Sequence, residues 1–323
     1  MEHRTDMPAD PWVHALESLH GGHRTVLVKV VDHSGSVPGV TGTMAVVSEL
    51  GIAGTIGGGA AERELLERAR AHQDGSEIIR FRHTPGEGGT LCSGLQVFAV
   101  SRLTKDDVQE LQNLVDTVSD HRNGTLHVNP GGLRFDAGIS GEPVFVEADD
   151  GWSFSEPVGF LDTLTIIGGG HVSLAFSRVM ATLPFRIVLL DNRAELPTME
   201  ANGFAHERRV VDYGQVAEHV PNGDRSWVVI MTYGHVHDRQ VLAGLLGRDY
   251  AYLGVLGSRA KIHSMFADMR AEGASPDALS RVRAPVGLSI GSHTPEEIAV
   301  SIAGEIIAVR NGKENPCPPS NSS

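Results

Sequence analysis

A short glycine-rich turn in the second half of the chain has the residue types that bind phosphate. The segment LTIIGGGHVSLAFSRV, residues 164–179, is an apolar run followed by three glycines and an amphipathic stretch. A strand that ends in glycines and leads into a helix directs backbone N–H groups and the helix dipole at one point. Gly168 and Gly170 match the first two glycines of the dinucleotide-binding fingerprint, and Ser173 replaces the third. We therefore expect a bound phosphate, the alternative being a similar scaffold with an empty or repurposed crevice.

Asp191 ends the next apolar run, FRIVLLD, 23 residues after Gly168. An acidic residue at this point of a dinucleotide-binding fold can bond a ribose hydroxyl. Because the fold pattern does not fix the chemistry, redox use of NAD(P) is one reading of this turn among others.

A second glycine turn stands in the first half, in GTIGGGAAERELLERAR, residues 54–70. Gly57, Gly58 and Gly59 lie between an apolar run and a helical pattern, which makes a second candidate anion nest. Glu62 in the first helical turn would oppose an anion, so it either caps the helix or bonds N–H groups of a ligand. The alternative is a tight turn whose glycines need positive φ.

Cys92 lies among small residues in GEGGTLCSGLQV. A thiolate in such a loop can bind a soft metal or a sulfur centre, although a buried structural cysteine is at least as common. The pattern lacks the further cysteines and histidines of a structural zinc site.

Two further polar segments follow strand-like runs of the second half. MTYGHVHD places His235, His237 and Asp238 after an apolar run. Histidines two positions apart in an extended chain would point to one side and could bind a metal. The simpler interpretation is a surface loop rich in histidine. In GSRAK, Arg259 and Lys261 could hold a phosphate or carboxylate, or belong to a solvated helical turn.

These residues must be positioned by two domains that differ in their pattern of strands and helices. From residue 162 onward apolar strands alternate with amphipathic helices, which predicts a doubly wound, Rossmann-like α/β domain with a parallel sheet over 160–312. Residues 1–155 mix short strands and helices and predict a separate α+β domain, with two or three short strands before Phe154 and a turn-rich linker at 151–162. The polar, proline-rich residues 313–323 predict a disordered tail.

The charge, the apolar runs and the cysteine content of the sequence limit which partners and which cellular location we expect. The net charge is −13 and no basic cluster occurs, which argues against nucleic acid and against an anionic membrane surface. The first residues of the chain, MEHRTDMPADPWVH, lack the apolar core of a signal peptide, and no apolar run approaches the length of a spanning helix, so we expect neither feature. Two cysteines cannot make a disulfide framework, so we expect a reducing, cytoplasmic location.

Taken in order, the motifs of the chain resemble those of the xanthine dehydrogenase accessory family, also called XdhC/CoxI. They are GSVPG, GTIGGGAAE, LCSG, GGGHV, DNR, MTYGHVHD, YLGVLGSRAK and PVGLSIGSHTPEEIAVSIAGEII, and they cover most of residues 10–312. The chain departs from the family pattern at Ser93, where glycine is frequent, at Tyr233, where histidine or arginine is common, and at Gly304, where alanine is usual.

The resemblance implies a molybdenum-cofactor chaperone rather than a catalyst. Such a protein would bind molybdopterin or its dinucleotide form, assist its sulfuration with a cysteine desulfurase, and deliver it to a molybdenum hydroxylase; we also expect a homodimer. By position, the first domain's site would comprise Gly57, Gly58, Gly59, Glu62 and Cys92, with Cys92 toward the molybdenum. The second domain's crevice would be lined by Gly168, Gly170, His171, Asp191, Arg193, His235, Asp238, Ser258, Arg259 and Lys261.

Two other classes of function stay open at this point. A NAD(P)-dependent oxidoreductase would use the same crevice, with His235 or His171 as acid or base, and would bind NAD(P) tightly. A purely structural partner of a hydroxylase complex would show no affinity for a small molecule.

Overall fold

The computed structural model describes residues 10–84, 93–138, 141–149 and 151–312. The chain divides into two compact units, Met1–Gly159 and Phe160–Ser323. Cys92 and the residues expected to form a disordered tail, 313–323, lie outside the described residues.

The described residues of unit 1 form two antiparallel sheets and three α-helices. The first sheet has the strand order β3-β2-β1-β5-β4 and the second the order β7-β6-β9-β8. The strands of the first sheet are β1 (Thr25–Gly35), β2 (Met44–Ser48), β3 (Gly51–Thr55), β4 (Ser76–His83) and β5 (Gly94–Leu103). Those of the second are β6 (Asn123–Asn129), β7 (Gly132–Ala137), β8 (Val144–Ala148) and β9 (Gly151–Gly159).

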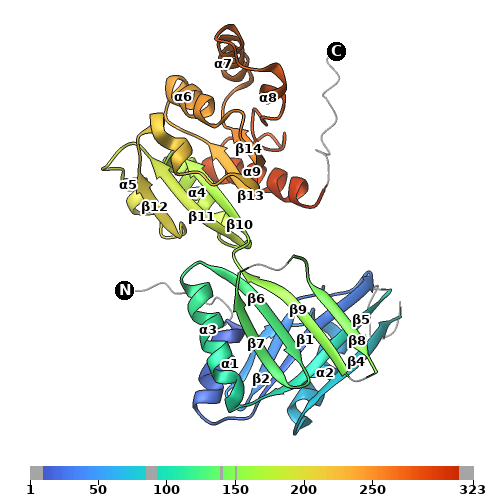
Figure 1. Cartoon of the computed structure of the whole chain (residues 1–323). Helices are drawn as coiled ribbons and strands as arrows, with labels where there is room; N and C mark the ends of the chain where they lie inside the picture. Colours follow the sequence, from blue (N-terminus) through green and yellow to red (C-terminus); the bar gives the residue numbers. More distant parts are fainter. Residues whose placement is uncertain (1–9, 85–92, 139–140, 150, 313–323) are drawn as a thin grey trace. The chain divides into compact units, whose positions relative to one another are not determined.

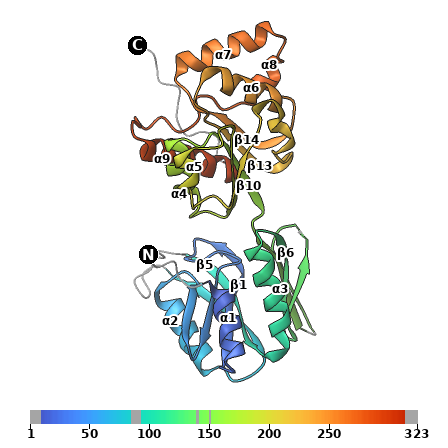
Figure 2. The same ribbon diagram turned by 90° about the vertical axis from the view of Figure 1, so that its left-hand side faces the viewer.

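The helices of unit 1 cover both faces of its first sheet. One face packs against α2 (Gly59–Ala71) through Leu65 and Ala69. The other faces a core shared by α1 (Pro11–His20), α3 (Val108–Ser119, preceded by the short helix η2, Lys105–Asp107) and the second sheet. Helices α1 and α3 lie side by side (Figure 2). The expected α+β class is therefore confirmed for this half.

The second sheet of unit 1 is larger than the sequence indicated. Four strands follow α3 instead of two or three, and the expected linker is largely strand β9. Pro157 and the flanking glycines are typical of a turn, but Pro157 pairs with Thr125 of β6 at a point beyond the pairing with β8, which ends at Ser155. Its missing N–H therefore disrupts no ladder on that side.

Unit 2 is a doubly wound domain around a five-stranded parallel sheet (Figure 1), as expected. The strand order is β12-β11-β10-β13-β14. Successive strands are added on one side of β10 as far as β12 and then on its other side from β13, so the topological switch point lies between β10 and β13. The strands are β10 (Asp162–Ile167), β11 (Phe185–Asp191), β12 (Glu207–Val210), β13 (Gly223–Ile230) and β14 (Tyr250–Val255).

Side chains alternate between the two faces of this sheet and give two cores. One core joins the sheet to α4 (His171–Met180), the short α5 (Pro197–Glu200) and α9 (Pro295–Arg310). The other joins it to η3 (Tyr213–Glu218), α6 (His235–Leu245), α7 (Arg259–Ala271) and α8 (Pro276–Ser280). Because helices cover both faces, the strands are apolar on both sides, and this explains runs such as FRIVLLD.

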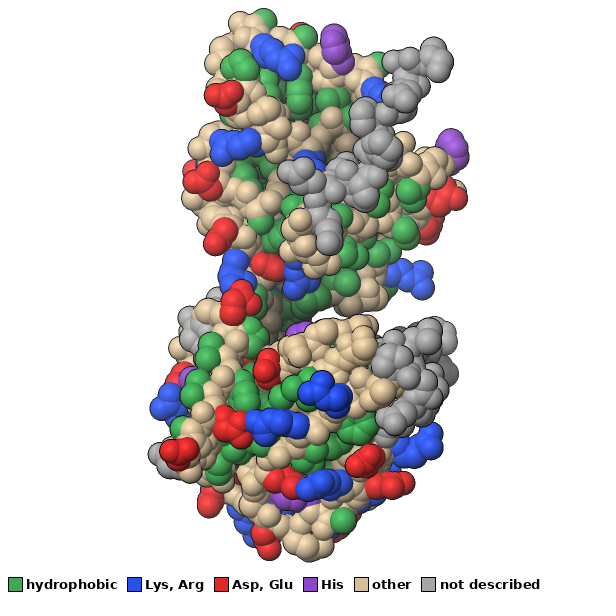
Figure 3. All heavy atoms as spheres, turned by 90° about the vertical axis from the view of Figure 1, so that its right-hand side faces the viewer, with side chains coloured by type: hydrophobic (Ala, Val, Ile, Leu, Met, Phe, Trp, Pro, Cys, Tyr) green, Lys and Arg blue, Asp and Glu red, His purple; other side chains and the backbone are tan. Residues whose placement is uncertain are grey.

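Within the described part of the chain, no helix is long and apolar enough to cross a membrane. On the face shown in Figure 3, acidic and basic side chains are interspersed over the described residues, without an extended region of one sign.

Candidate functional site

A crevice of about 580 Å³ lies at the carboxyl edge of the parallel sheet in unit 2. Segments that follow β10, β11, β13 and β14 form its walls, so it spans the switch point between β10 and β13. Ligands of open α/β sheets bind at this position. Its lining residues are Gly170, His171, Val172, Ser173, Arg193, Leu196, Pro197, Thr198, Met231, Thr232, Tyr233 and Leu256.

Gly168 is fixed by the fold itself. Its φ is +111°, and a Cβ atom at this position would lie 2.4 Å from the carbonyl oxygen of Met231 at the end of the neighbouring strand. Its N–H donates to Leu190 O at 2.7 Å. The first glycine of the fingerprint therefore permits the close approach of β10 to β13, and it does not line the crevice.

Gly170 is different, because packing alone does not require a glycine there. Its φ is −73°, which any residue adopts, and a Cβ would meet no atom of the described residues within 4 Å. Gly170 is also the N-cap of α4, and within the described chain no side chain caps this helix. The crevice thus contains a helix N-terminus with unsatisfied N–H groups and free space in front of them, which suits a phosphate.

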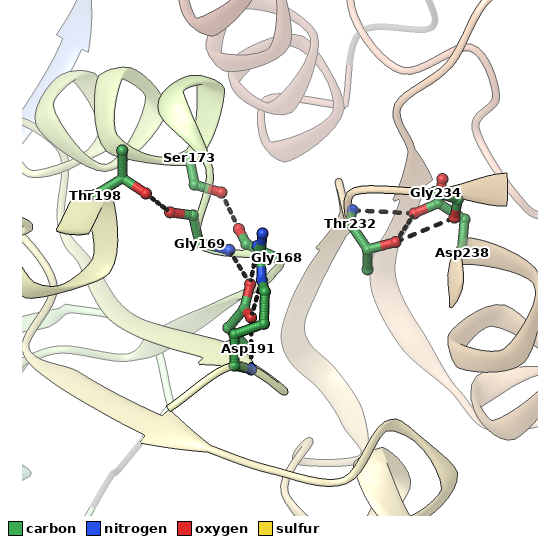
Figure 4. A network of polar contacts seen from close by, with 9 residues as sticks. Gly168, Gly169, Ser173, Asp191, Thr198, Thr232, Gly234 and Asp238 are labelled. Carbon is green, nitrogen blue, oxygen red and sulfur yellow. Dashed lines mark hydrogen bonds and ion pairs between the residues drawn. The ribbon is translucent and has the colours of Figure 1, made fainter. Parts of the chain in front are cut away.

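The carbonyl groups of the turn, in contrast, have partners (Figure 4). The hydroxyl of Ser173, which is buried, donates to Gly168 O, and the hydroxyl of Thr198 donates to Gly169 O. Serine at the third fingerprint position therefore stabilises the turn instead of only being tolerated. With both carbonyl oxygens bonded, the groups left for a ligand are N–H donors.

Asp191 bonds the protein's own groups. Its buried carboxylate accepts hydrogen bonds from Gly169 N (2.7 Å), Arg193 N (2.9 Å), and Arg193 Nε and Nη2 (both 2.8 Å). Burial by itself would raise the pKa of Asp191, but the hydrogen bonds from Arg193 and the Gly169 amide outweigh it and hold that pKa below its ordinary value. A ribose hydroxyl would have to compete with these four donors.

Arg193 pairs with Asp191 and also lines the crevice. Its guanidinium group is clamped by Asp191, and its Cζ lies 4.3 Å from the ring centroid of Tyr233, which is 53% exposed. Tyr233 in turn packs on His237. A cation, an aromatic ring and the N-terminus of α4 therefore all border one cavity.

The stability of unit 2 is expected to depend on the charge of Asp191. Because its folded pKa is lowered, its contribution is complete above the unfolded value, near 3.8, and is lost as pH falls through the folded pKa. Urea unfolding from pH 7 to pH 2.5 should show Asp191→Asn less stable than the parent at neutral pH, with the difference shrinking below about pH 4. A difference independent of pH would contradict this assignment.

Asp238, in the first turn of α6, links the segment after β13 to helix α7 at the same sheet edge. Its buried carboxylate accepts from Thr232 N (3.0 Å) and from the Thr232 hydroxyl (2.6 Å), as Figure 4 shows. It also accepts from Lys261 Nζ. Lys261 is therefore paired with Asp238, and neither residue belongs to the crevice lining.

The two histidines of GHVHD do not form the extended pair that the sequence suggested. They belong to the first turn of α6, which begins at His235, and residues two apart on a helix point in different directions. Gly234, in an extended conformation, is the N-cap residue of this helix. His235 is half-buried outside the crevice lining, and in the described residues no group of three His, Cys, Asp or Glu could hold a metal.

Ser258 and Arg259 open helix α7. The Ser258 hydroxyl caps it by accepting from Lys261 N at 3.3 Å, and Arg259 is exposed without an ion pair to another described residue. These two residues also lie outside the crevice lining. Of the predicted second-domain set, Gly170, His171 and Arg193 line the crevice.

The glycine turn of unit 1 is a tight connection between β3 and α2 that relies on the positive φ open to glycine. Gly57, Gly58 and Gly59 all have positive φ, and a Cβ on Gly57 would lie 2.5 Å from Gly39 N. Glu62 reaches back to accept from Ile56 N (3.1 Å) and the Thr55 hydroxyl (2.7 Å), so it bonds the chain's own groups. The tight-turn reading is confirmed, and ligand binding at this turn stays a prediction.

Sequence reasoning missed several lining residues, above all Thr198 and Tyr233. Thr198 lies in the short α5, and its segment carries no periodic pattern. Tyr233 departs from the family pattern, and in the structure it stacks on Arg193 at the crevice mouth.

The parallel sheet, its switch-point crevice and the glycine turn define a Rossmann-like domain that follows an α+β domain in the chain. The family model described as XdhC Rossmann domain matches residues 164–306, and the model described as XdhC and CoxI family matches residues 18–82. The chain belongs to the XdhC/CoxI family.

Individual relatives agree with this assignment. "Uncharacterized protein YqeB" of Escherichia coli is 26% identical over 289 residues, covering 88% of this chain and 43% of the relative. A Bacillus subtilis protein named as a probable xanthine dehydrogenase subunit is 27% identical over 147 residues, covering 46% of this chain and 42% of the relative. The chain thus spans less than half the length of these curated relatives.

A crystal structure described as a xanthine dehydrogenase from Bacillus halodurans matches 96% of this chain and 98% of its own, with a TM-score of 0.74 and 21% identity. It shows that the fold of the whole chain is shared.

Proposed function

We propose that the protein binds the molybdenum cofactor and supports the maturation of a xanthine-dehydrogenase-type molybdenum hydroxylase. Family membership and the name of the Bacillus subtilis relative support this class of role. The proposal extends to sulfuration with a cysteine desulfurase, to a homodimer and to a cytoplasmic location, all of which stay predictions.

The observation that carries the proposal is the uncapped N-terminus of α4 in front of Gly170. The cofactor has a pterin with a phosphate, or a pyrophosphate in its dinucleotide form, and the helix N-terminus can hold that group through N–H donors. Arg193 borders the same space and adds a fixed positive charge. The residues present therefore fit the phosphate end of the cofactor.

The cofactor, when bound, supplies the molybdenum–dithiolene chemistry of the client enzyme. The chain's own residues would hold and orient it: backbone N–H groups at Gly170 and His171 for the phosphate, and the guanidinium of Arg193 at the mouth. Cys92 of the first domain, which lies outside the described residues, stays a prediction as a thiol for the molybdenum.

Gly170→Val tests the phosphate site without disturbing the fold. A branched side chain would fill the free space before the helix N-terminus, so we expect cofactor affinity to fall about ten- to a hundredfold. The matched control is Gly203→Val, because a Cβ there also meets no described atom within 4 Å and Gly203 lies outside the crevice lining. Calorimetric titration of parent and variants with the cofactor, NAD⁺ and NADP⁺, with circular dichroism for folding, measures the effect.

The outcomes separate the candidate functions. Unchanged cofactor affinity in folded Gly170→Val would reject the phosphate site. Tight binding of NAD⁺ or NADP⁺ to the parent, with cofactor binding unaffected by the change, would favour the oxidoreductase. Cys92→Ala in the same series should retain less molybdenum after identical loading, and equal retention would remove Cys92 from the proposal.

A further inference from the structure

Unit 2 contains a second cavity, of about 620 Å³, that shares no lining residue with the crevice. It lies along the edge strand β14 and is lined by residues 246–248 and 250–253, by residues 278 and 280–285, and by Glu305 of α9. Its volume is in the range of small-molecule sites. Neither the glycine turns nor the other residues of the proposed cofactor site border it.

Three arginines line this cavity in a protein whose net charge is −13. They are Arg248, Arg281 and Arg283, and the one acidic residue among the described lining residues is Glu305. The side chains that line the cavity therefore carry a net positive charge, although the chain as a whole is acidic, and this favours binding of an anion.

The donors of these arginines are only partly used. Arg248 donates to the carbonyl oxygens of Ala217 and Val220, which are neutral groups, and forms no ion pair with a described carboxylate. Arg281 Nη1 is 3.5 Å from Asp249 Oδ1, in a pair that is largely exposed. Exposed pairs of this kind contribute little, so its charge stays available.

Arg283 and Glu305 form a loose pair at one wall of the cavity. Arg283 Nη1 lies 3.8 Å from Glu305 Oε1, beyond hydrogen-bond distance. Glu305 Oε2 is already bonded, because it accepts from the Tyr252 hydroxyl (2.6 Å) and Gly287 N (2.7 Å). The buried glutamate thus anchors β14 and the loop before α9, and the guanidinium of Arg283 keeps free donors.

Tyr250 adds an unsatisfied polar group to the same lining. Its hydroxyl is buried and has no hydrogen-bond partner among the described residues. Burial raises the pKa of Tyr250, so the hydroxyl stays protonated and can donate at neutral pH. A buried hydroxyl without a partner costs free energy, and a ligand acceptor would remove that cost.

We propose that this cavity is a binding site for a small organic anion that carries at least two acidic oxygens, either a phosphorylated or a polycarboxylate compound. Guanidinium groups bind both kinds of oxygen pair with forked hydrogen bonds, and the Tyr250 hydroxyl supplies a further neutral donor. The site is independent of the proposed function, since it lies outside the crevice.

The test uses the full-length protein with inorganic pyrophosphate and citrate as probes in separate calorimetric titrations. The variant Arg281→Gln/Arg283→Gln should bind at least one probe about tenfold or more weakly than the parent. The control Arg178→Gln/Arg270→Gln removes the same charge from two exposed arginines of α4 and α7, and its affinity should stay within about twofold of the parent. Loss of pyrophosphate binding assigns a phosphorylated ligand, and loss of citrate binding a polycarboxylate.

Two further variants make the result specific. Without probe, Tyr250→Phe should melt at the same or a higher temperature than the parent, because it removes an unpaired hydroxyl. The rise in Tm on adding probe should be smaller for Tyr250→Phe than for the parent. Gly170→Val should keep the probe binding that the arginine variant loses. The proposal is overturned if the parent binds neither probe, if both double variants lose affinity equally, or if Gly170→Val abolishes the binding.

Discussion

Replacing Glu156 by glutamine is expected to destabilise unit 1 by about 3 kcal/mol. Lys29 Nζ lies 2.6 Å from Glu156 Oε1, and the two side chains are 1% and 8% exposed. The pair joins β1 of the first sheet to β9 of the second, and the same ammonium group donates to Gly42 O at 2.9 Å. Glutamine keeps the shape and removes the countercharge, so it would leave a buried lysine uncompensated.

Glu147→Gln is the matched control for this change, because it makes the same substitution in an exposed pair with Arg80. That pair should contribute at most about 1 kcal/mol. Urea unfolding of each variant, followed by circular dichroism, gives the comparison. Adding Lys29→Met to Glu156→Gln should recover part of the loss; a double variant less stable than Glu156→Gln would show that the charge is not the cause.

Gly168→Ala is expected to destabilise unit 2 by about 3 kcal/mol or more, through overpacking and an unfavourable φ together. The added methyl would lie 2.4 Å from Met231 O and 2.8 Å from Thr232 Cα, both of which are backbone atoms that cannot move independently. The parallel pairing of β10 with β13 would have to open to admit it.

The neighbouring change Gly170→Ala controls for the loss of a glycine in the same turn. Because Gly170 has an ordinary φ and open space around its Cα, Gly170→Ala should lower the free energy of unfolding by no more than about 1 kcal/mol, mainly because alanine is a poorer N-cap residue. Thermal unfolding of both variants separates the two positions. Similar melting temperatures would mean that the turn relaxes freely, and that Gly168 is not required by the strand packing.

These variants also separate two uses of glycine that the fingerprint combines. At Gly168 the small residue serves the fold, and at Gly170 it leaves space in front of a helix N-terminus. Loss of ligand binding in Gly168 variants would therefore come with loss of structure, whereas Gly170 variants test the ligand directly.

The sequence by itself determined the two-part organisation, the fold class of each half and the family. Alternating apolar strands and amphipathic helices are local patterns, and they suffice for a doubly wound sheet because the parallel strands need apolar residues on both faces. The glycine turn at 168–170 was also correctly placed, since strand, glycines and helix follow directly in the chain. The strand β9 was missed because its proline and glycines resemble a turn until the partner strand is known.

Only the tertiary structure decided which polar residues face the crevice. Asp191 looked free to bind a ribose, but its carboxylate is bonded by Gly169 and by Arg193. Asp238 and Lys261, 23 residues apart, pair with each other outside the crevice lining. A carboxylate in a sequence does not reveal all of its hydrogen-bond partners, because some of them, such as Gly169 for Asp191 and Lys261 for Asp238, come from other segments that the strand order brings to the same sheet edge. The pairing of buried charges is therefore settled by packing between distant segments, not by local pattern.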